Sequence, residues 1–158
     1  MAPGVPWSAD RGVIVASETL VFMLEEPSAE TVLLRLLPEI LPPDVPFQTI
    51  PHRGKRDLQK SLPRKLRAWQ MPARFIVLHD QDSNDCRALK EELKALCAES
   101  GRDDTMVRIA CRELEAWYFG DLEALAGAFP EAPVQEFRRK AGYRGDPDAI
   151  PKPAEALE

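Results

Sequence analysis

The sequence predicts an α/β fold, with a mainly parallel sheet of about four strands and helices on both of its faces. Three observations lead to this prediction. Short apolar runs alternate with longer segments in which apolar residues recur at helical spacing. Several runs are unbroken, as in strands that are covered on both faces. Carboxylates follow most of the runs, where the carboxyl ends of parallel strands lie. The predicted strands are residues 19–24, 47–50, 74–79 and 106–111.

The first predicted helix follows Pro27 and spans residues 28–41. Ser28 suits its N-cap, because a serine hydroxyl can accept a hydrogen bond from a free backbone N–H of the first turn. The consecutive prolines at 42 and 43 end the helix. Apolar residues at helical spacing predict its buried side, which consists of Val32, Leu33, Leu36, Leu37 and Ile40.

A second helix is predicted in the basic segment that follows Gly54. Pro63 lacks a backbone N–H, so we expect it to kink this helix or to split it near Ser61. The apolar residues of the segment recur at steps of four, four and three, and they share one helical face: Leu58, Leu62, Leu66 and Trp69.

Further helices are predicted over residues 84–99, ending at Gly101, over 112–119, after Gly120, and over 134–141. Trp69 and Trp117 are expected in the core. Residues 142–153 form a predicted loop, and residues 153–158 resemble the first turn of an unfinished helix. We therefore expect an irregular lead-in over residues 1–17 and a single domain over 18–158 that continues beyond this end.

Composition excludes several classes of protein. A chain of 158 residues with 44% hydrophobic and 30% charged residues is typical of a soluble globular domain. It contains no apolar run near the roughly 18 residues of a membrane span, and its first residues do not resemble a secretory signal. Cys86, Cys97 and Cys111 are odd in number and widely spaced, which favours buried free thiols in the cytoplasm.

The charge distribution is uneven. The formal net charge is -5, yet residues 52–67 contain seven Lys or Arg and a single acid, Asp57. A local basic patch on an acidic protein is typical of a phosphate-contacting surface, and here it points to nucleic acid. The alternative is an ordinary solvated helix face. The candidate phosphate-binding residues are Lys55, Arg56, Lys60 and Arg64.

Acidic residues gather at the predicted strand ends, which meet at one edge of a parallel sheet. Asp80 and Asp82 would share one side of an extended segment, whereas His79 would point away from both. Crowded carboxylates repel one another, and a hard divalent cation such as Mg²⁺ or Mn²⁺ relieves the repulsion. The alternative is a polar loop with a helix cap. The candidate acids are Glu25, Glu26 and Glu30, then Asp80, Asp82 and Asp85, then Glu113 and Glu115.

Several motifs carry a family resemblance. The Glu-Glu-Pro-Ser-Ala-Glu turn at 25–30 and the Asp-Gln-Asp at 80–82 resemble the two acidic motifs of TOPRIM domains. With the segments at 54–58, 112–117 and 150–153, residues 19–158 resemble the DUF4276 family of TOPRIM-like proteins, related to OLD-type nucleases. This resemblance implies a Rossmann-like or TOPRIM-like fold, a catalytic Glu25 or Glu26, and Mg²⁺ or Mn²⁺ held by aspartates. It also implies an AAA-type ATPase partner in bacterial defence loci.

Two functions are consistent with these observations. The first is a Mg²⁺-dependent nuclease acting on DNA or RNA, with Glu25 or Glu26 in acid/base catalysis and a metal ion held by Glu25, Glu30, Asp80 and Asp82. Asp85, Glu113 and Glu115 are additional candidate acids. The second is a non-catalytic module that binds a nucleotide or a partner protein at the same edge. The sequence contains no Walker lysine loop and no Gly-rich dinucleotide motif.

Overall fold

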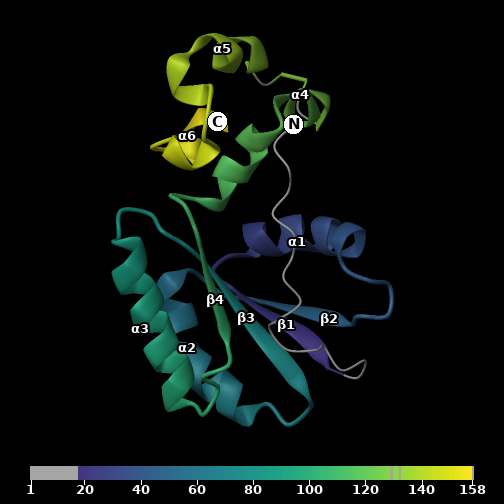
Figure 1. The fold of residues 1–158 in the computed structure, drawn as a ribbon, viewed down its shortest axis with the longest axis vertical. Helices are drawn as coiled ribbons and strands as arrows, with labels where there is room; N and C mark the ends of the chain where they lie inside the picture. The colour runs from purple at the N-terminus through teal and green to yellow at the C-terminus, as the bar shows by residue number, and fades with distance from the viewer. Residues whose placement is uncertain (1–17, 129, 132, 158) are drawn as a thin grey trace.

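The computed structural model describes residues 18–128, 130–131 and 133–157, so the predicted lead-in over 1–17 lies outside the described residues. Its centre is a four-stranded parallel sheet with the strand order β2-β1-β3-β4. The strands are β1 (Thr19–Leu24), β2 (Phe47–Pro51), β3 (Ala73–Asp80) and β4 (Met106–Ala110). Helices cover both faces (Figure 1). The predicted α/β fold is therefore confirmed.

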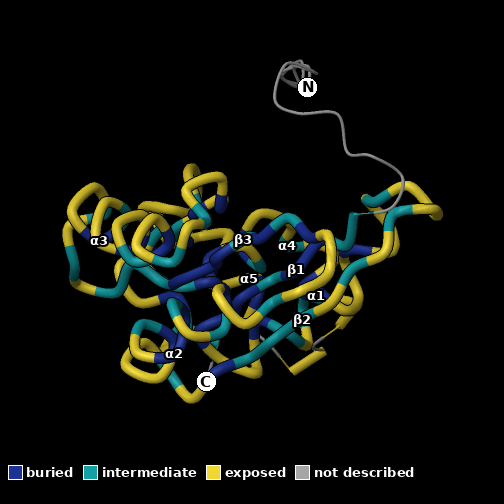
Figure 2. Tube along the Cα trace, turned by 90° about the horizontal axis from the view of Figure 1, so that it is seen from below, coloured by how far each residue is buried: buried dark blue, intermediate teal, exposed yellow. Residues whose placement is uncertain are grey.

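Alternating side chains of the strands pack into two separate hydrophobic cores, one on each face of the sheet. Val21 and Met23 of β1 pack with α2 (Lys55–Ala68) and α3 (Cys86–Glu99) on one face. Leu24 belongs to a smaller core under α1 (Pro27–Ile40) on the other face. The two central strands, β1 and β3, are accordingly among the most buried segments of the chain (Figure 2). Burial on both faces explains why β1 and β3 are unbroken apolar runs in the sequence.

A small helical lobe follows β4 and has a core of its own. It contains η1 (Leu114–Gly120), α4 (Leu122–Ala128), α5 (Val134–Arg139), η2 (Ala141–Tyr143), η3 (Pro147–Ala149) and α6 (Pro153–Leu157). The rings of Phe119, Phe137 and Tyr143 lie with centroids 5.0–5.4 Å apart in its centre. The lobe lies beyond the carboxyl ends of the strands (Figure 1). No helix in the described part of the chain is long and apolar enough to cross a membrane.

Helix α1 differs from its prediction in its N-cap residue and in its buried side. Glu26, not Ser28, occupies the N-cap, and Pro27 begins the helix, a position where its missing N–H costs nothing. The buried residues are Ala29, Leu33 and Leu37, spaced four apart. Two residues assigned to the core are exposed, Leu36 by 38% and Ile40 by 61%. The sheet covers only one narrow stripe of this helix, and a leucine-rich sequence does not show which stripe.

Other differences are local. Helix α2 is continuous through Pro63, so it is not split near Ser61, while its predicted apolar face is confirmed at Leu58, Leu62 and Leu66. The segment after β4 is a 3₁₀ helix rather than an α-helix. Trp69 packs edge-to-face on Phe75, as expected of a core residue, but Trp117 is 42% exposed, so its core assignment is wrong. All three cysteines are free, and only Cys97 is buried.

Candidate active site at the carboxyl edge of the sheet

The strand order places a topological switch point between β1 and β3. The chain leaves β1 through α1 on one face and leaves β3 through α3 on the other face. In open parallel sheets, the crevice beyond the carboxyl ends of such strands is the usual ligand site. Glu25 directly follows β1, and Asp80 ends β3. Two of the predicted acids therefore flank the position that the topology favours for a ligand.

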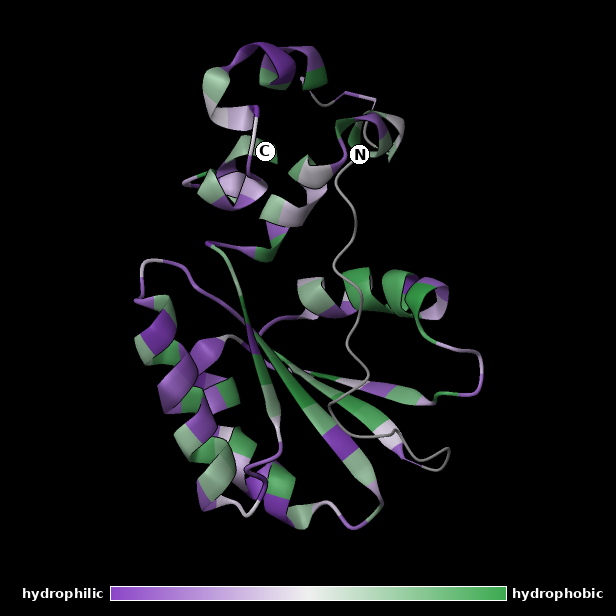
Figure 3. Cartoon of the chain, in the orientation of Figure 1, coloured by the Kyte–Doolittle hydropathy of each residue, from purple (hydrophilic) through white to green (hydrophobic). Residues whose placement is uncertain are grey.

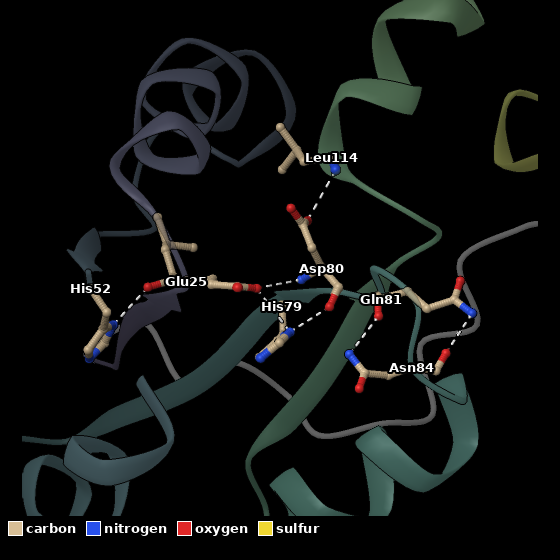
Figure 4. A network of polar contacts seen from close by, with 8 residues as sticks. Glu25, His52, His79, Asp80, Gln81, Asn84 and Leu114 are labelled. Atoms are coloured by element: carbon tan, nitrogen blue, oxygen red, sulfur yellow. Dashed lines mark hydrogen bonds and ion pairs between the residues drawn. The ribbon is translucent and has the colours of Figure 1, made fainter. Parts of the chain in front are cut away.

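Glu25 is a buried carboxylate with two partners (Figure 4). Its Oε2 accepts a hydrogen bond from the backbone N–H of Asp80 at 2.9 Å and lies 3.0 Å from Nδ1 of His79. Burial opposes the ionisation of Glu25, but these hydrogen bonds and the nearby charges of His79 and Lys55 together lower its pKa. Glu25 is therefore an ionised group that joins β1 to β3.

The sequence predicts that His79 points away from Asp80, because neighbouring residues of a strand face opposite sides. That orientation is correct, but Glu25 lies on the same face as His79. The side chain of His79 is fully buried, and its Nε2 has no hydrogen-bond partner among the described residues. Burial opposes its protonation, yet the contact with Glu25 and the hydrogen bond from Nδ1 to the carbonyl of Asp80 at 2.6 Å together raise its pKa. The alternation of β1, in which Val21 and Met23 precede Glu25 on this face, was the signal for the pairing.

Asp80 and Asp82 bind the end of β3 to the segment after β4. Oδ1 of Asp80 accepts a hydrogen bond from the N–H of Leu114 at 3.1 Å (Figure 4). Asp82 has a φ of 51°, in the left-handed region, and its N–H donates to the carbonyl of Arg112 at 2.7 Å. The extended segment predicted to carry both aspartates is therefore wrong, because the strand ends at Asp80 and the chain turns at Asp82.

Five carboxylates form an acidic cluster at this edge, namely Glu25, Glu26, Asp80, Asp82 and Glu115. Burial raises the pKa of Asp80 to about 7, with further contributions from Glu25, Glu115 and Asp82. Partial burial also raises the pKa of Glu26, and the negative charges of Glu25, Glu115 and Asp82 add to the effect. Negative charge is thus in excess here, and an added proton or cation stabilises the arrangement.

The other three candidate acids form hydrogen bonds away from the acidic cluster. Glu30 accepts from the hydroxyl of Thr49 at 2.7 Å, which links α1 to β2. Asp85 is the N-cap of α3 and accepts from the N–H of Ala88 at 2.8 Å. Glu113 accepts from the N–H of Ala154 at 2.9 Å, at the start of α6. Each of these carboxylates has a structural task in the fold.

The candidate phosphate-binding residues lie on α2. Lys55 is the first residue of the helix, and its positive charge helps to lower the pKa of Glu25. Arg56, Lys60 and Arg64 are exposed and four residues apart, so they form one basic face. His52 lies behind this helix and is buried, with Nδ1 donating to the carbonyl of Leu24 at 2.7 Å and Nε2 2.8 Å from Nζ of Lys65. The basic face therefore begins next to the acidic cluster.

The donor chemistry fits a hard divalent cation, because carboxylate oxygens are the ligands that Mg²⁺ and Mn²⁺ prefer. The excess negative charge at Asp80 and Glu26 points the same way. Among the described residues, however, no group of three His, Cys, Asp or Glu side chains is already arranged to hold a metal ion. Side chains of the acidic cluster would have to move to close around a cation.

The chain matches a known family over most of its length. The family model described as "Domain of unknown function (DUF4276)" matches residues 24–158, a range that includes the acidic cluster, α2 and the helical lobe. Comparisons with curated proteins and with solved structures find no match.

Proposed function

The chain belongs to the DUF4276 family, and we propose that it is a Mg²⁺- or Mn²⁺-dependent nuclease with a TOPRIM-like site. Its reaction is the hydrolysis of phosphodiester bonds in DNA or RNA. The observation that carries the proposal is the acidic cluster at the switch point between β1 and β3. There burial and mutual repulsion raise the pKa of Asp80 to about 7, which is the electrostatic state that a bound divalent cation relieves.

The residues of the cluster have different roles in this reaction. Asp80 and Asp82 would hold the cation, and a bound cation would supply polarisation of the phosphate and stabilisation of the leaving oxygen. Glu25 is kept ionised by His79 and the N–H of Asp80, so it is suited to accept the proton of the attacking water. Glu26 is largely exposed, and partial desolvation of its carboxyl together with its acidic neighbours raises its pKa, which favours it as the group that donates a proton to the leaving oxygen.

The basic face of α2 supports a polymeric anionic substrate. Lys55, at the start of α2, is close enough for its charge to lower the pKa of Glu25. Arg56, Lys60 and Arg64 extend the positive charge along the helix. Four residues of helix rise about 6 Å, so the face extends over about two turns beyond the cluster. A strand that is bound along α2 would have one of its phosphates at the cluster.

Metal binding is tested by thermal unfolding with increasing MnCl₂ or MgCl₂. A cation that binds only the folded chain raises its melting temperature, and 100 times the dissociation constant adds about 2.7 kcal/mol. We expect this rise in the wild type and its loss in Asp80→Asn. Asp104→Asn is the matched control, because Asp104 is an exposed acid before β4, at the opposite edge of the sheet. Equal shifts in all three proteins would rule out the metal assignment.

Catalysis is tested by incubating the wild type with single- and double-stranded DNA and RNA in MnCl₂. We expect cleavage that Glu25→Gln and Asp80→Asn abolish and Asp104→Asn retains. A wild type that binds metal but cuts none of the four substrates would favour the second function, a non-catalytic module for a nucleotide or an ATPase partner. That function is favoured by one contact, since Oε2 of Glu25 is already occupied by His79 and Asp80.

A further inference from the structure

A groove between α1 and η1 has no role in the proposed reaction. It encloses about 520 Å³ and is lined mainly by apolar surface. Two of its residues are large exposed hydrophobic side chains, Leu36 and Trp117. Figure 3 shows α1 as the most uniformly hydrophobic of the three helices on the sheet. The lining residues are Thr31, Val32, Arg35, Leu36, Glu39, Trp117 and Tyr118.

The groove lies near the acidic cluster, and Glu115 relates the two. Glu115 belongs to the cluster, where its negative charge helps to raise the pKa of Asp80 and of Glu26. It lies two residues before Trp117 in η1. Burial raises the pKa of Tyr118 in the groove, and the charge of the same carboxylate adds to this rise. On the α1 side, Thr31 donates to the carbonyl of Pro27 at 3.2 Å, within the first turn after Glu26. A ligand bound at the cluster therefore lies close enough for an adjoining part of it to reach the groove.

The lining of the groove matches the chemistry of a nucleobase. An exposed indole offers a flat face for stacking, with the aliphatic side chains of Val32 and Leu36 beside it. Arg35 supplies hydrogen-bond donors and Glu39 supplies acceptors for the edge of a base. Neither of these two charged side chains forms an ion pair within the described ranges, so both are available to a ligand. An entirely apolar partner surface would leave both charges without a counterpart.

We propose that this groove binds one unpaired nucleobase of the strand whose phosphate lies at the acidic cluster, with Trp117 as its stacking platform. The proposal rests on the proposed function, and it assigns the substrate class as single-stranded nucleic acid or a base turned out of a duplex. A base inside a duplex is covered on both faces by its neighbours and cannot stack on a side chain. The strand then passes between the basic face of α2 and the groove beside α1.

The test is binding of a 5′-fluorescein-labelled single-stranded 12-mer in CaCl₂, measured by fluorescence anisotropy. Trp117→Ala is expected to weaken binding about 5- to 100-fold, the range for loss of one stacked base, whereas Trp117→Phe keeps most of the affinity. Leu34→Ala is the control, because Leu34 is an exposed residue of α1 that does not line the groove. It is expected to bind as the wild type does.

An abasic scan of the same 12-mer identifies the stacked base. Removing one base is expected to weaken wild-type binding as much as Trp117→Ala does, and to have no further effect in that variant. Wild-type oligonucleotide affinity in Trp117→Ala would overturn the groove assignment. If light scattering also shows that this variant has changed its oligomeric state, the groove is instead a contact between copies of the chain. Binding through Trp117 without any cleavage defeats the proposed nuclease alone. No binding by the wild type defeats both.

Discussion

At the scale of single residues, the contact between Glu25 and His79 is the most consequential in the site. Both side chains are buried, 10% and 0% exposed, and each alters the ionisation of the other. Removing one partner of a buried pair leaves an uncompensated charge, which costs far more than the pair contributes. The energetic role of the contact is therefore measured by removing both partners as well as each one.

We expect His79→Leu to destabilise the fold by about 3 kcal/mol, because it leaves an ionised Glu25 buried with only a backbone donor. Glu25→Gln in the same chain should restore part of this loss. The coupling energy in the double-mutant cycle should be about 1–3 kcal/mol. Urea unfolding at pH 7 of the wild type, both single variants and the double variant measures it. Strictly additive losses would mean that the two side chains do not interact.

His52 gives a pH dependence of stability. Its burial lowers its pKa, the hydrogen bond to Leu24 and the charge of Asp57 oppose the shift, and the charge of Lys65 adds to it. The unfolded chain therefore binds a proton more readily than the fold does. The contribution of His52 to stability is present above its unfolded pKa of about 6.5 and is lost as the pH falls through its folded pKa. His79, whose pKa is raised, contributes in the opposite direction, below its unfolded pKa.

Comparison with His52→Asn separates this histidine from all other titrating groups. Asparagine keeps a donor toward Leu24 but carries no proton that titrates in this range. The wild type should be the more stable protein at pH 7.5, and its advantage should shrink at pH 6.5 and again at pH 5.5. Urea midpoints at the three values measure the difference. An advantage that is constant across the three would show that His52 does not titrate differently in the two states.

At the scale of elements, helix α2 carries most of the basic residues of the segment 52–67. Lys60→Gln/Arg64→Gln removes two charges from its exposed side without touching Leu58, Leu62 or Leu66 underneath. If each lysine or arginine contacts one phosphate, the logarithmic salt slope of single-strand binding should fall by about 1.4. Anisotropy titrations at several salt concentrations between about 50 and 200 mM measure the slope. Arg139→Gln/Lys140→Gln, on the exposed surface of α5, should leave it unchanged.

Most elements could be predicted from the sequence, because strands buried on both faces have an unmistakable apolar pattern. The order of the elements, the parallel sheet and the acids at the strand ends follow from that pattern. The failures share one cause, which is tertiary contact that no local pattern records. The exposure of Leu36 and Trp117 depends on how little of α1 and η1 the sheet covers, and the left-handed turn at Asp82 depends on the carbonyl of Arg112.

At the scale of the whole molecule, the helical lobe and the sheet meet at the acidic cluster. Asp80 accepts from Leu114 at the start of η1, and Glu113 accepts from Ala154 at the start of α6. The sequence placed Glu113 among the acids at the sheet edge but gave no sign of this second contact, because the two residues are 41 positions apart. Glu113 thus belongs to the junction between lobe and sheet.

This junction predicts a local effect of Glu113→Ala. The N–H of Ala154 loses its acceptor, which costs about 1 kcal/mol because the hydrogen bond is only partly buried, and the start of α6 should open more often. Amide hydrogen exchange over residues 147–157 should quicken about 10-fold for each 1.4 kcal/mol lost, while β1 and β3 exchange as before. Glu155→Ala is the matched control, because its ion pair with Lys152 is exposed and contributes little.

The same variant separates a structural carboxylate from a metal ligand. If Glu113 only holds the lobe, Glu113→Ala keeps the rise in melting temperature with MnCl₂ that Asp80→Asn loses, although it starts from a lower value. Loss of the rise together with unchanged exchange over 147–157 would instead make Glu113 a ligand. Uniformly faster exchange in the sheet and the lobe would show that the two parts unfold as one unit, and that the junction governs the stability of the whole chain.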